Sequence, residues 1–249
     1  MNAGPHLSVQ LYTVRNAISE DLDGTLDRIA RLGFRTVEAY DFVGRVDEYA
    51  QAFQKFGLTP ESAHAKLLGE DVARAFEAAR ALGVQTVIEP YIPEDRWTTP
   101  DDIVETARLL NQLVPIAQSY GVRLGYHNHS WELEHVFDGS TALELFANEL
   151  DPAVVLELDT YWAAVGGQDV PSLLHRLGSR VQYLHVKDGD ISKNHLAQTA
   201  VGSGRMPVLD VLAAAPTATR IVELDGFDGD IFDALADSAR FLTTHGETL

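Results

Sequence analysis

The sequence predicts a single α/β domain folded as a (β/α)8 barrel, a closed ring of eight parallel strands surrounded by helices. Apolar runs of strand length alternate with amphipathic helical runs along the 249 residues. Parallel neighbours need a crossover connection, and a helix is the usual one. Eight such units in about 250 residues is the typical size of a barrel. No linker-like change of composition divides the chain, so we expect one domain over residues 1–249.

The strands are expected where the apolar runs occur. They are Leu7–Val14, Thr36–Tyr40, Thr59–Ala65, Thr86–Tyr91, Arg123–His127, Val154–Asp159, Val181–Lys187 and Arg220–Asp225. Five helical runs end in a glycine, which favours the left-handed C-cap: Gly33, Gly57, Gly83, Gly121 and Gly178. The main alternative is an open doubly wound sheet. A dinucleotide-binding version of it is disfavoured, because no GxGxxG motif follows the first strand.

Several helices carry clear start signals. The sequence Thr-Pro-Asp-Asp predicts a capped helix over Thr99–Tyr120, with acids at its positive end. Thr141 and Glu144 have the spacing of a capping box. Pro171 marks the start of another helix, and Ile231–Thr244 supplies the last one.

The composition excludes several classes of protein. The chain has no cysteine, so disulfides, thiolate nucleophiles and cysteine-bound zinc are excluded. Nineteen basic against thirty-seven acidic residues give a formal net charge of −18, which repels nucleic acid and anionic membranes. No apolar stretch approaches the ~18–20 residues of a membrane span. We expect a cytoplasmic protein that binds neither nucleic acid nor membrane.

In a (β/α)8 barrel the active site lies at the C-terminal ends of the strands. In chain order those ends deliver Gln10 and Tyr12, Glu38, His64, Glu89, His127 and His129 with Glu132 behind them, Glu157 and Asp159, His185 and Lys187, and Glu223 and Asp225. Each alone has an ordinary alternative, such as a solvated acid or a helix cap. Together they form a cluster of acidic groups whose mutual repulsion costs free energy unless a cation or a substrate offsets it. Carboxylates and imidazoles suit Mn²⁺, Mg²⁺, Co²⁺ or Zn²⁺.

The stretch VRLGYHNHSWE is the densest part of this set. Strand side chains alternate, so His127 and His129 point to one side and Asn128 to the other. The two imidazoles could serve as metal ligands or acid–base groups. A pair of hydrogen-bonded loop histidines is the alternative. Glu157 lies deeper in its strand, where a hydrogen bond to a ligand is expected rather than direct contact.

Four segments resemble the sugar phosphate isomerase/epimerase superfamily, which has the xylose isomerase-like barrel fold. They are LELDTYWAAVGG (Leu156–Gly167), YLHVKDGD (Tyr183–Asp190), VGSGRMP (Val201–Pro207) and IVELDG (Ile221–Gly226). GYHNHSWEL resembles one subgroup of it. The superfamily includes endonuclease IV, inosose dehydratase, hydroxypyruvate isomerase and ketose 3-epimerases. The endonuclease activity is not expected, because Trp162 stands where a further zinc-binding histidine would be and the net charge opposes DNA.

The resemblance implies one divalent metal ion, held by a Glu, an Asp, a His and a Glu after strands five to eight. Asp159, His185 and Glu223 match the last three positions. The first position differs from the family pattern, because ketose epimerases carry a glutamate at the position that His127 occupies in this chain. We expect Glu132 to fold back and supply that carboxylate, with His127 as the alternative ligand.

Three functions stay open. The first is an isomerase or epimerase on a sugar or keto sugar, in which Glu132 and Glu223 move a proton next to a carbonyl through an enediolate. The second is a dehydratase or lyase on an inosose or 3-keto sugar, with His127 or His129 as the base. The third is a barrel that binds a sugar without turnover.

Substrate contacts are expected from side chains at the barrel mouth: Gln10, Glu38, His64, Glu89, Lys187, Arg205 and Trp162. Trp131 and Trp162 could stack on a sugar ring, and packing in the core is the alternative. Arg205, in a glycine-rich loop, could reach a hydroxyl or carboxylate, and a plain connector is the alternative. The expected partner is an unphosphorylated, sugar-like small molecule, and assembly into a homo-oligomer is left open.

Overall fold

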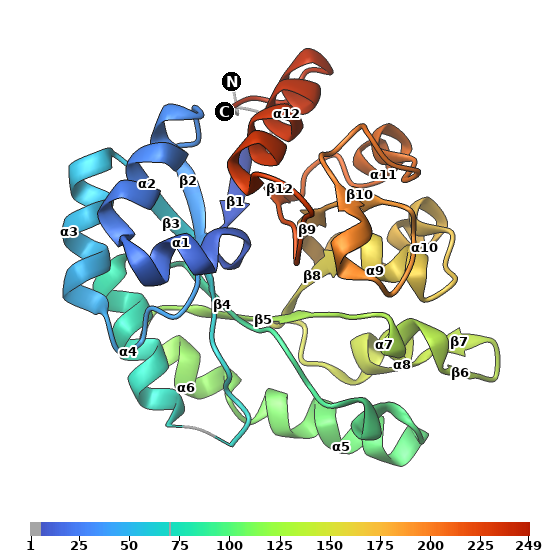
Figure 1. Cartoon of the computed structure of the whole chain (residues 1–249). Helices are drawn as coiled ribbons and strands as arrows, with labels where there is room; N and C mark the ends of the chain where they lie inside the picture. The colour runs from blue at the N-terminus through green and yellow to red at the C-terminus, as the bar shows by residue number, and fades with distance from the viewer. Residues whose placement is uncertain (1–5, 70) are drawn as a thin grey trace.

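A closed barrel of eight parallel strands forms the centre of the computed structural model, which describes residues 6–69 and 71–249 (Figure 1). The strands are β1 (Leu7–Gln10), β2 (Thr36–Ala39), β3 (Thr59–His64), β4 (Thr86–Glu89), β5 (Arg123–His127), β8 (Val155–Asp159), β9 (Val181–Val186) and β12 (Thr219–Val222). The ring closes at β1, where Val9 pairs with Val222 on one side and Val37 on the other. The predicted (β/α)8 barrel is confirmed.

Helices surround the strands on the outside (Figure 1). They are α1 (Arg15–Glu20), α2 (Leu22–Arg31), α3 (Val46–Phe56), α4 (Val72–Leu82), α5 (Pro100–Asn111), α6 (Val114–Ser119), α7 (Trp131–Glu134), α8 (Ala142–Glu149), α9 (Thr160–Val165), α10 (Val170–Leu177), α11 (Val208–Ala214) and α12 (Ile231–Thr244). Two short hairpins, β6 (Val136–Phe137) with β7 (Ser140–Thr141) and β10 (Asp188–Gly189) with β11 (Gln198–Thr199), lie in the loops after β5 and β9. Within residues 6–69 and 71–249, no helix combines the length and the apolar character needed to cross a membrane.

The local signals of the sequence reappear in the backbone. All five predicted glycine positions have positive φ: Gly33, Gly57, Gly83, Gly121 and Gly178. The side chain of Thr99 accepts a hydrogen bond from the backbone of Asp102 at the start of α5. Thr141 and Glu144 form both hydrogen bonds of the capping box. These turn and cap residues therefore set the boundaries of most helices.

Two boundaries differ from the prediction. The first strand ends at Gln10, and Leu11–Val14 forms a 3-10 turn, because the Gln10 side chain accepts a hydrogen bond from the backbone of Tyr12. The helix predicted over 99–120 is two helices, α5 and α6. Pro115 has no N–H to bond the carbonyl four residues earlier, at the end of α5, so the helix breaks there.

The interior of the barrel changes from apolar to polar along the strands. Ile88, Val155, Tyr183 and Ile221 form a separate buried cluster between the strands. Side chains two residues further along a strand point to the same face. Those positions are Glu157 on β8, His185 on β9 and Glu223 directly after β12, so the charged groups lie next to this apolar cluster.

Gly125 on β5 fits this interior because it has no side chain. A Cβ there would lie 2.9 Å from Ile88 Cγ1 and 3.3 Å from Val155 Cγ2. We expect Gly125→Ala to lower the free energy of unfolding by about 1–3 kcal/mol through overpacking, measured by urea denaturation. Gly44→Ala is the control, since a Cβ at Gly44 has no neighbour within 4 Å. Equal stability of the two variants would contradict the packing argument.

Candidate active site

Two groups of side chains at the C-terminal end of the barrel have potential ligand atoms within 4.8 Å of one another. Among the described residues, one group is Asp159, His185 and Glu223, and the other is His64, His127, Glu157 and His185. His185 belongs to both groups. It comes from β9, and its neighbours come from β3, β5, β8 and the segment after β12, so the closed barrel brings together residues far apart in the sequence.

The group of His64, His127, Glu157 and His185, called here the deeper group, is organised around Glu157. One oxygen, Oε2, lies 2.6 Å from His64 Nε2 and 3.0 Å from His127 Nδ1, so it can accept from both rings. Burial alone would raise the pKa of Glu157, but the rings of His185 and His64 hold it well below its usual range. Glu157 therefore orients the histidines from beneath, as the sequence suggested.

Glu38 and Gln10 complete this layer. Glu38 Oε1 lies 2.7 Å from His185 Nε2 and accepts a hydrogen bond of 2.7 Å from Gln10 Nε2. All three side chains are buried. Gln10 and Glu38 thus hold His185 rather than reach the open mouth of the barrel.

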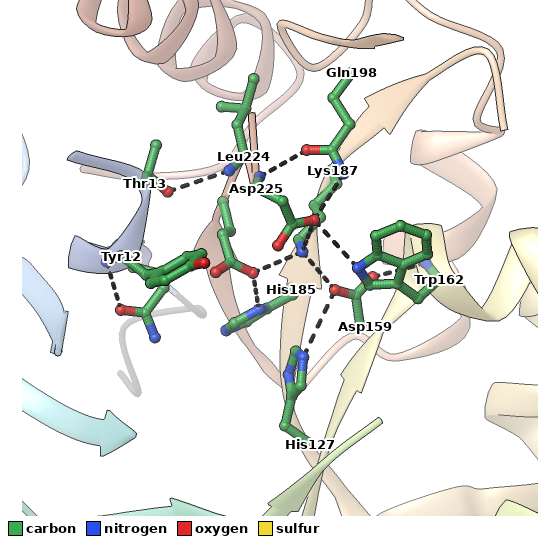
Figure 2. A network of polar contacts seen from close by, with 12 residues as sticks. Tyr12, Thr13, His127, Asp159, Trp162, His185, Lys187, Gln198, Leu224 and Asp225 are labelled. Atoms are coloured by element: carbon green, nitrogen blue, oxygen red, sulfur yellow. Dashed lines mark hydrogen bonds and ion pairs between the residues drawn. The ribbon is translucent and has the colours of Figure 1, made fainter. Parts of the chain in front are cut away.

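The other group, called here the upper group, consists of Asp159, His185 and Glu223. A lysine lies among its carboxylates (Figure 2). Lys187 Nζ lies 2.7 Å from Asp159 Oδ2, 2.7 Å from Glu223 Oε2 and 2.8 Å from Asp225 Oδ2. Burial raises the pKa of Asp159 to about 6, although the Lys187 ammonium acts in the opposite direction. Burial also acts to raise the pKa of Glu223, but Lys187 and His185 hold it well below its usual range.

Trp162 anchors Asp225 at this edge. Its indole Nε1 donates to Asp225 Oδ2 at 3.1 Å, and Gln198 Nε2 donates to the same oxygen at 2.7 Å. The side chain of Trp162 is half-buried and does not line the large cavity described next. Its observed contact is therefore with a carboxylate, whereas the sequence suggested a sugar ring.

A cavity of about 680 Å³ opens above these groups. Its floor includes His64, His127, His129, Glu223 and Asp225. Its rim comes from the loops after β1 to β4 and includes Tyr12, Tyr40, Asp41, Phe42, Lys66, Asp71, Arg74 and Tyr91. Most of these rim residues were not predicted from the sequence. The only available signal was that barrel loops at this end carry ligand contacts.

His129 is the cavity histidine outside both groups. Its ring stacks on Trp131 at 4.4 Å between centroids, and its Nδ1 is buried without a hydrogen-bond partner. Burial, with the nearby Lys187 charge, lowers the pKa of His129 to about 4. A neutral imidazole with a free nitrogen can accept a proton from a bound molecule.

Glu132 lies elsewhere than expected. Its carboxylate accepts hydrogen bonds from the Tyr126 hydroxyl at 2.5 Å and from the His129 backbone N–H at 2.9 Å. Glu132 belongs to neither ligand group and does not line the cavity. The reason is alternation on β5: Tyr126 points opposite to His127, towards Trp97, and draws Glu132 with it. Burial raises the pKa of Glu132 to about 8.

Glu89 also points away from the cavity. Ile88 faces the barrel interior, so the next residue on β4 faces outwards. The Glu89 carboxylate accepts the backbone N–H groups of Leu67, Leu68 and Tyr91. It fixes the loop after β3, and its expected substrate contact is replaced by this structural role.

Arg205 is exposed, and it does not line the cavity. Its loop is held by Asp188, a residue that the sequence analysis did not single out. The Asp188 carboxylate accepts backbone N–H groups from Gly189, Gly202, Gly204 and Met206. The glycine-rich segment is thus a connector wrapped around a buried carboxylate, which was the alternative interpretation.

The side chains of the upper group have the chemistry of a divalent-cation site. Asp159 Oδ2 is buried and accepts no hydrogen bond of good geometry, although Lys187 is near. His185 Nδ1 faces Glu223 Oε2 at 2.5 Å, again without a hydrogen bond. Burial acts to lower the pKa of His185, but Glu157 and Glu223 raise it well above its usual value. The group therefore already attracts positive charge, which a divalent cation would supply.

His127 is placed to complete this group. Its Nδ1 is held by Glu157, while its Nε2 lies 3.9 Å from Asp159 Oδ2. A carboxylate bound to one ring nitrogen commonly orients the other nitrogen towards a metal. His127, the alternative ligand in the sequence analysis, therefore has the geometry that Glu132 lacks.

The chain is similar to known proteins over most of its length. Residues 26–242 match the family described as xylose isomerase-like TIM barrel. A curated relative, inosose dehydratase of Geobacillus kaustophilus (strain HTA426), is 36% identical over 80 residues, which are 32% of this chain and 25% of the relative. That match spans only a quarter of the relative's length.

Two solved structures share the fold. A sugar phosphate isomerase/epimerase from Parabacteroides distasonis ATCC 8503 has a TM-score of 0.83 and 24% identity, and the match covers 98% of this chain and 96% of that one. The IolI protein, solved with a bound zinc atom, has a TM-score of 0.69 and 18% identity, covering 96% of each chain. At these identities the likeness establishes the fold.

Proposed function

The chain belongs to the xylose isomerase-like TIM barrel family, and from that premise we propose that it is a divalent-metal-dependent isomerase or epimerase of a sugar or keto sugar. The observation that carries the proposal is the buried group of Asp159, His185 and Glu223, of which Glu223 lines a cavity of about 680 Å³. Ionisable groups under an accessible cavity are the arrangement expected of an active site.

The ligands proposed for the metal are Asp159, His185, Glu223 and His127, with His127 in the place first expected for Glu132. A bound divalent ion supplies Lewis-acid polarisation of a substrate carbonyl, which acidifies the neighbouring C–H bond. Mn²⁺, Mg²⁺, Co²⁺ and Zn²⁺ all accept such oxygen and imidazole ligands to differing degrees.

Proton transfer is assigned to two groups on the cavity wall. His129 is neutral and lines the cavity, so its ring can remove a proton from the carbon next to the carbonyl. Glu223 is ionised and also lines the cavity, so it can act on the substrate from a second position. Delivery of a proton to the opposite face of the same carbon gives an epimer, and delivery to the neighbouring carbonyl carbon gives an isomer. Glu132 acts through His129, whose backbone N–H it binds.

The rest of the cavity suits a neutral ring. Tyr12 and Tyr40 pack edge to face at 5.0 Å, and Tyr91 packs at 5.5 Å against His129 on another wall. Aromatic faces bind the C–H surface of sugars and leave hydroxyl groups for polar partners. His64 and Asp225 on the floor, and Lys66 and Arg74 on the rim, are among the polar groups that line the cavity.

A dehydratase is the second candidate, and two observations favour it. His129 lines the cavity whereas Glu132 does not, and a curated relative that matches 80 residues of this chain is an inosose dehydratase. If a hydroxyl lies beta to the carbonyl, proton removal by His129 leads to loss of water. An inosose or a 3-keto sugar would be the substrate.

Solvent exchange tests the proposal. The protein loaded with Mn²⁺ is incubated in D₂O with a panel of keto sugars and inososes and followed by NMR. Deuterium incorporation with a conserved carbon skeleton supports the isomerase or epimerase, whereas an enone absorbance with loss of water supports the dehydratase. His129→Gln should slow exchange by about 10²–10⁴-fold with unchanged metal content.

His175→Gln, an exposed change on α10, is the matched control and should exchange at the wild-type rate. Saturable binding of a sugar without exchange or water loss would contradict both candidates.

A further inference from the structure

The ammonium group of Lys187 lies between two of the proposed metal ligands. It is 2.7 Å from Asp159 Oδ2, a contact drawn in Figure 2. It is also 2.7 Å from Glu223 Oε2. The side chain is only 1% exposed, so water does not screen it appreciably. A cation held by the same two carboxylates would lie next to this ammonium.

Asp159 has only one oxygen to offer. Its Oδ1 accepts the backbone N–H of Trp162 at 2.8 Å and caps α9, which leaves Oδ2 for any cation. That is the oxygen that Lys187 approaches. Like charges repel strongly in a buried site, so the ammonium and a divalent ion cannot share this oxygen at full strength.

Asp225 provides a second place for the ammonium. It lies 2.8 Å from Lys187 Nζ, and it belongs to neither group of potential ligands. It is held in place by Trp162 Nε1, by Gln198 Nε2 and by its own backbone N–H, which donates to Gln198 Oε1. It also lines the cavity, so a lysine paired only with Asp225 would lie beside a bound substrate.

We propose that Lys187 is an internal competitor for the metal: its ammonium is shared by Asp159, Glu223 and Asp225 in the metal-free protein and is transferred fully to Asp225 when a divalent cation binds. The proposal rests on the metal site of the proposed function. It makes Lys187 a residue that lowers the metal affinity of the barrel while keeping the empty site stable. After transfer, the ammonium is held by Asp225, which lines the cavity.

Calorimetric titration of the metal-free protein with Mn²⁺ at constant pH tests this inference. Lys187→Met should bind Mn²⁺ at least tenfold more tightly than wild type, with unchanged stoichiometry, because the competing charge is gone. Its metal-free form should melt at a lower temperature, and Mn²⁺ should raise the melting temperature more than it does in wild type. Lys187→Gln, which keeps a polar group, is the second variant if Lys187→Met does not fold.

Lys193→Met is the matched control, since this exposed lysine pairs only with Glu134 among the described residues. It should bind Mn²⁺ as wild type does. If Lys187 instead organised the ligands, its removal would weaken binding, so the direction of the change decides between the two roles. Equal or weaker binding by both Lys187 variants overturns the proposal.

Asp225→Asn tests the transfer itself. It should weaken Mn²⁺ binding several-fold in the wild-type background, because the ammonium loses its alternative partner. In the Lys187→Met background the same change should have little effect, and a full effect there would show that Asp225 acts without the lysine. If Asp159→Asn bound Mn²⁺ as tightly as the wild type does, that result would instead refute the metal site of the proposed function.

Discussion

Asp159→Asn should remove tight divalent-metal binding and lower kcat/KM by about 10³-fold or more. The amide keeps the oxygen that caps α9 but loses the negative charge at Oδ2. Metal polarisation of a carbonyl is worth several kcal/mol of barrier, which corresponds to this loss in rate. Metal content after dialysis, measured by mass spectrometry, and the deuterium-exchange rate are the two readouts.

The fold should survive this substitution. Lys187 keeps Glu223 and Asp225 as partners, and the burial that raises the pKa of Asp159 to about 6 already opposes a charge there. Asp237→Asn on α12, an exposed change in a pair with Arg240, is the control and should bind metal normally. Wild-type metal content in the Asp159 variant would refute the proposed site.

The fold follows from local signals because those signals are independent of distant contacts. A glycine with positive φ ends each of five helical runs, and a capping box starts α8, so the helix boundaries were readable from neighbouring residues. The errors came from competing local effects. The apolar run after Gln10 continues in sequence, but the Gln10 side chain starts a 3-10 turn. Pro115 splits a helix whose start signal at Thr99 was correct.

Only those features of the site that follow from strand alternation could be predicted from the sequence. Alternation places His185 with Lys187 and His127 with His129 on the inner face, and the structure bears this out. The same rule would have placed Glu89 on the outer face, one residue after the buried Ile88. Nothing in the sequence shows that Lys187 lies between the carboxylates, because that depends on the closure of three strands around it.

Glu132 is the residue for which tertiary structure changed the interpretation most, and its titration gives a direct test. Burial raises its pKa to about 8, so the folded protein holds it neutral at pH 7 while the unfolded chain ionises it above about 4.5. As pH rises from 4.5 to 8 the unfolded chain loses a proton that the folded protein keeps. The stability contributed by this group is therefore full below pH 4.5 and is lost progressively up to pH 8.

Glu132→Gln should abolish this loss. Glutamine can accept from the His129 N–H and donate to Tyr126, but it does not titrate. The gap between the two pKa values corresponds to about 5 kcal/mol at most. We expect the wild type to lose a few kcal/mol relative to the variant between pH 5 and pH 8, measured by urea denaturation at both pH values. Glu134→Gln, an exposed change on the same helix, should track the wild type. If Glu132 were an ionised metal ligand instead, Glu132→Gln would lose metal and show no relative gain in stability at pH 8.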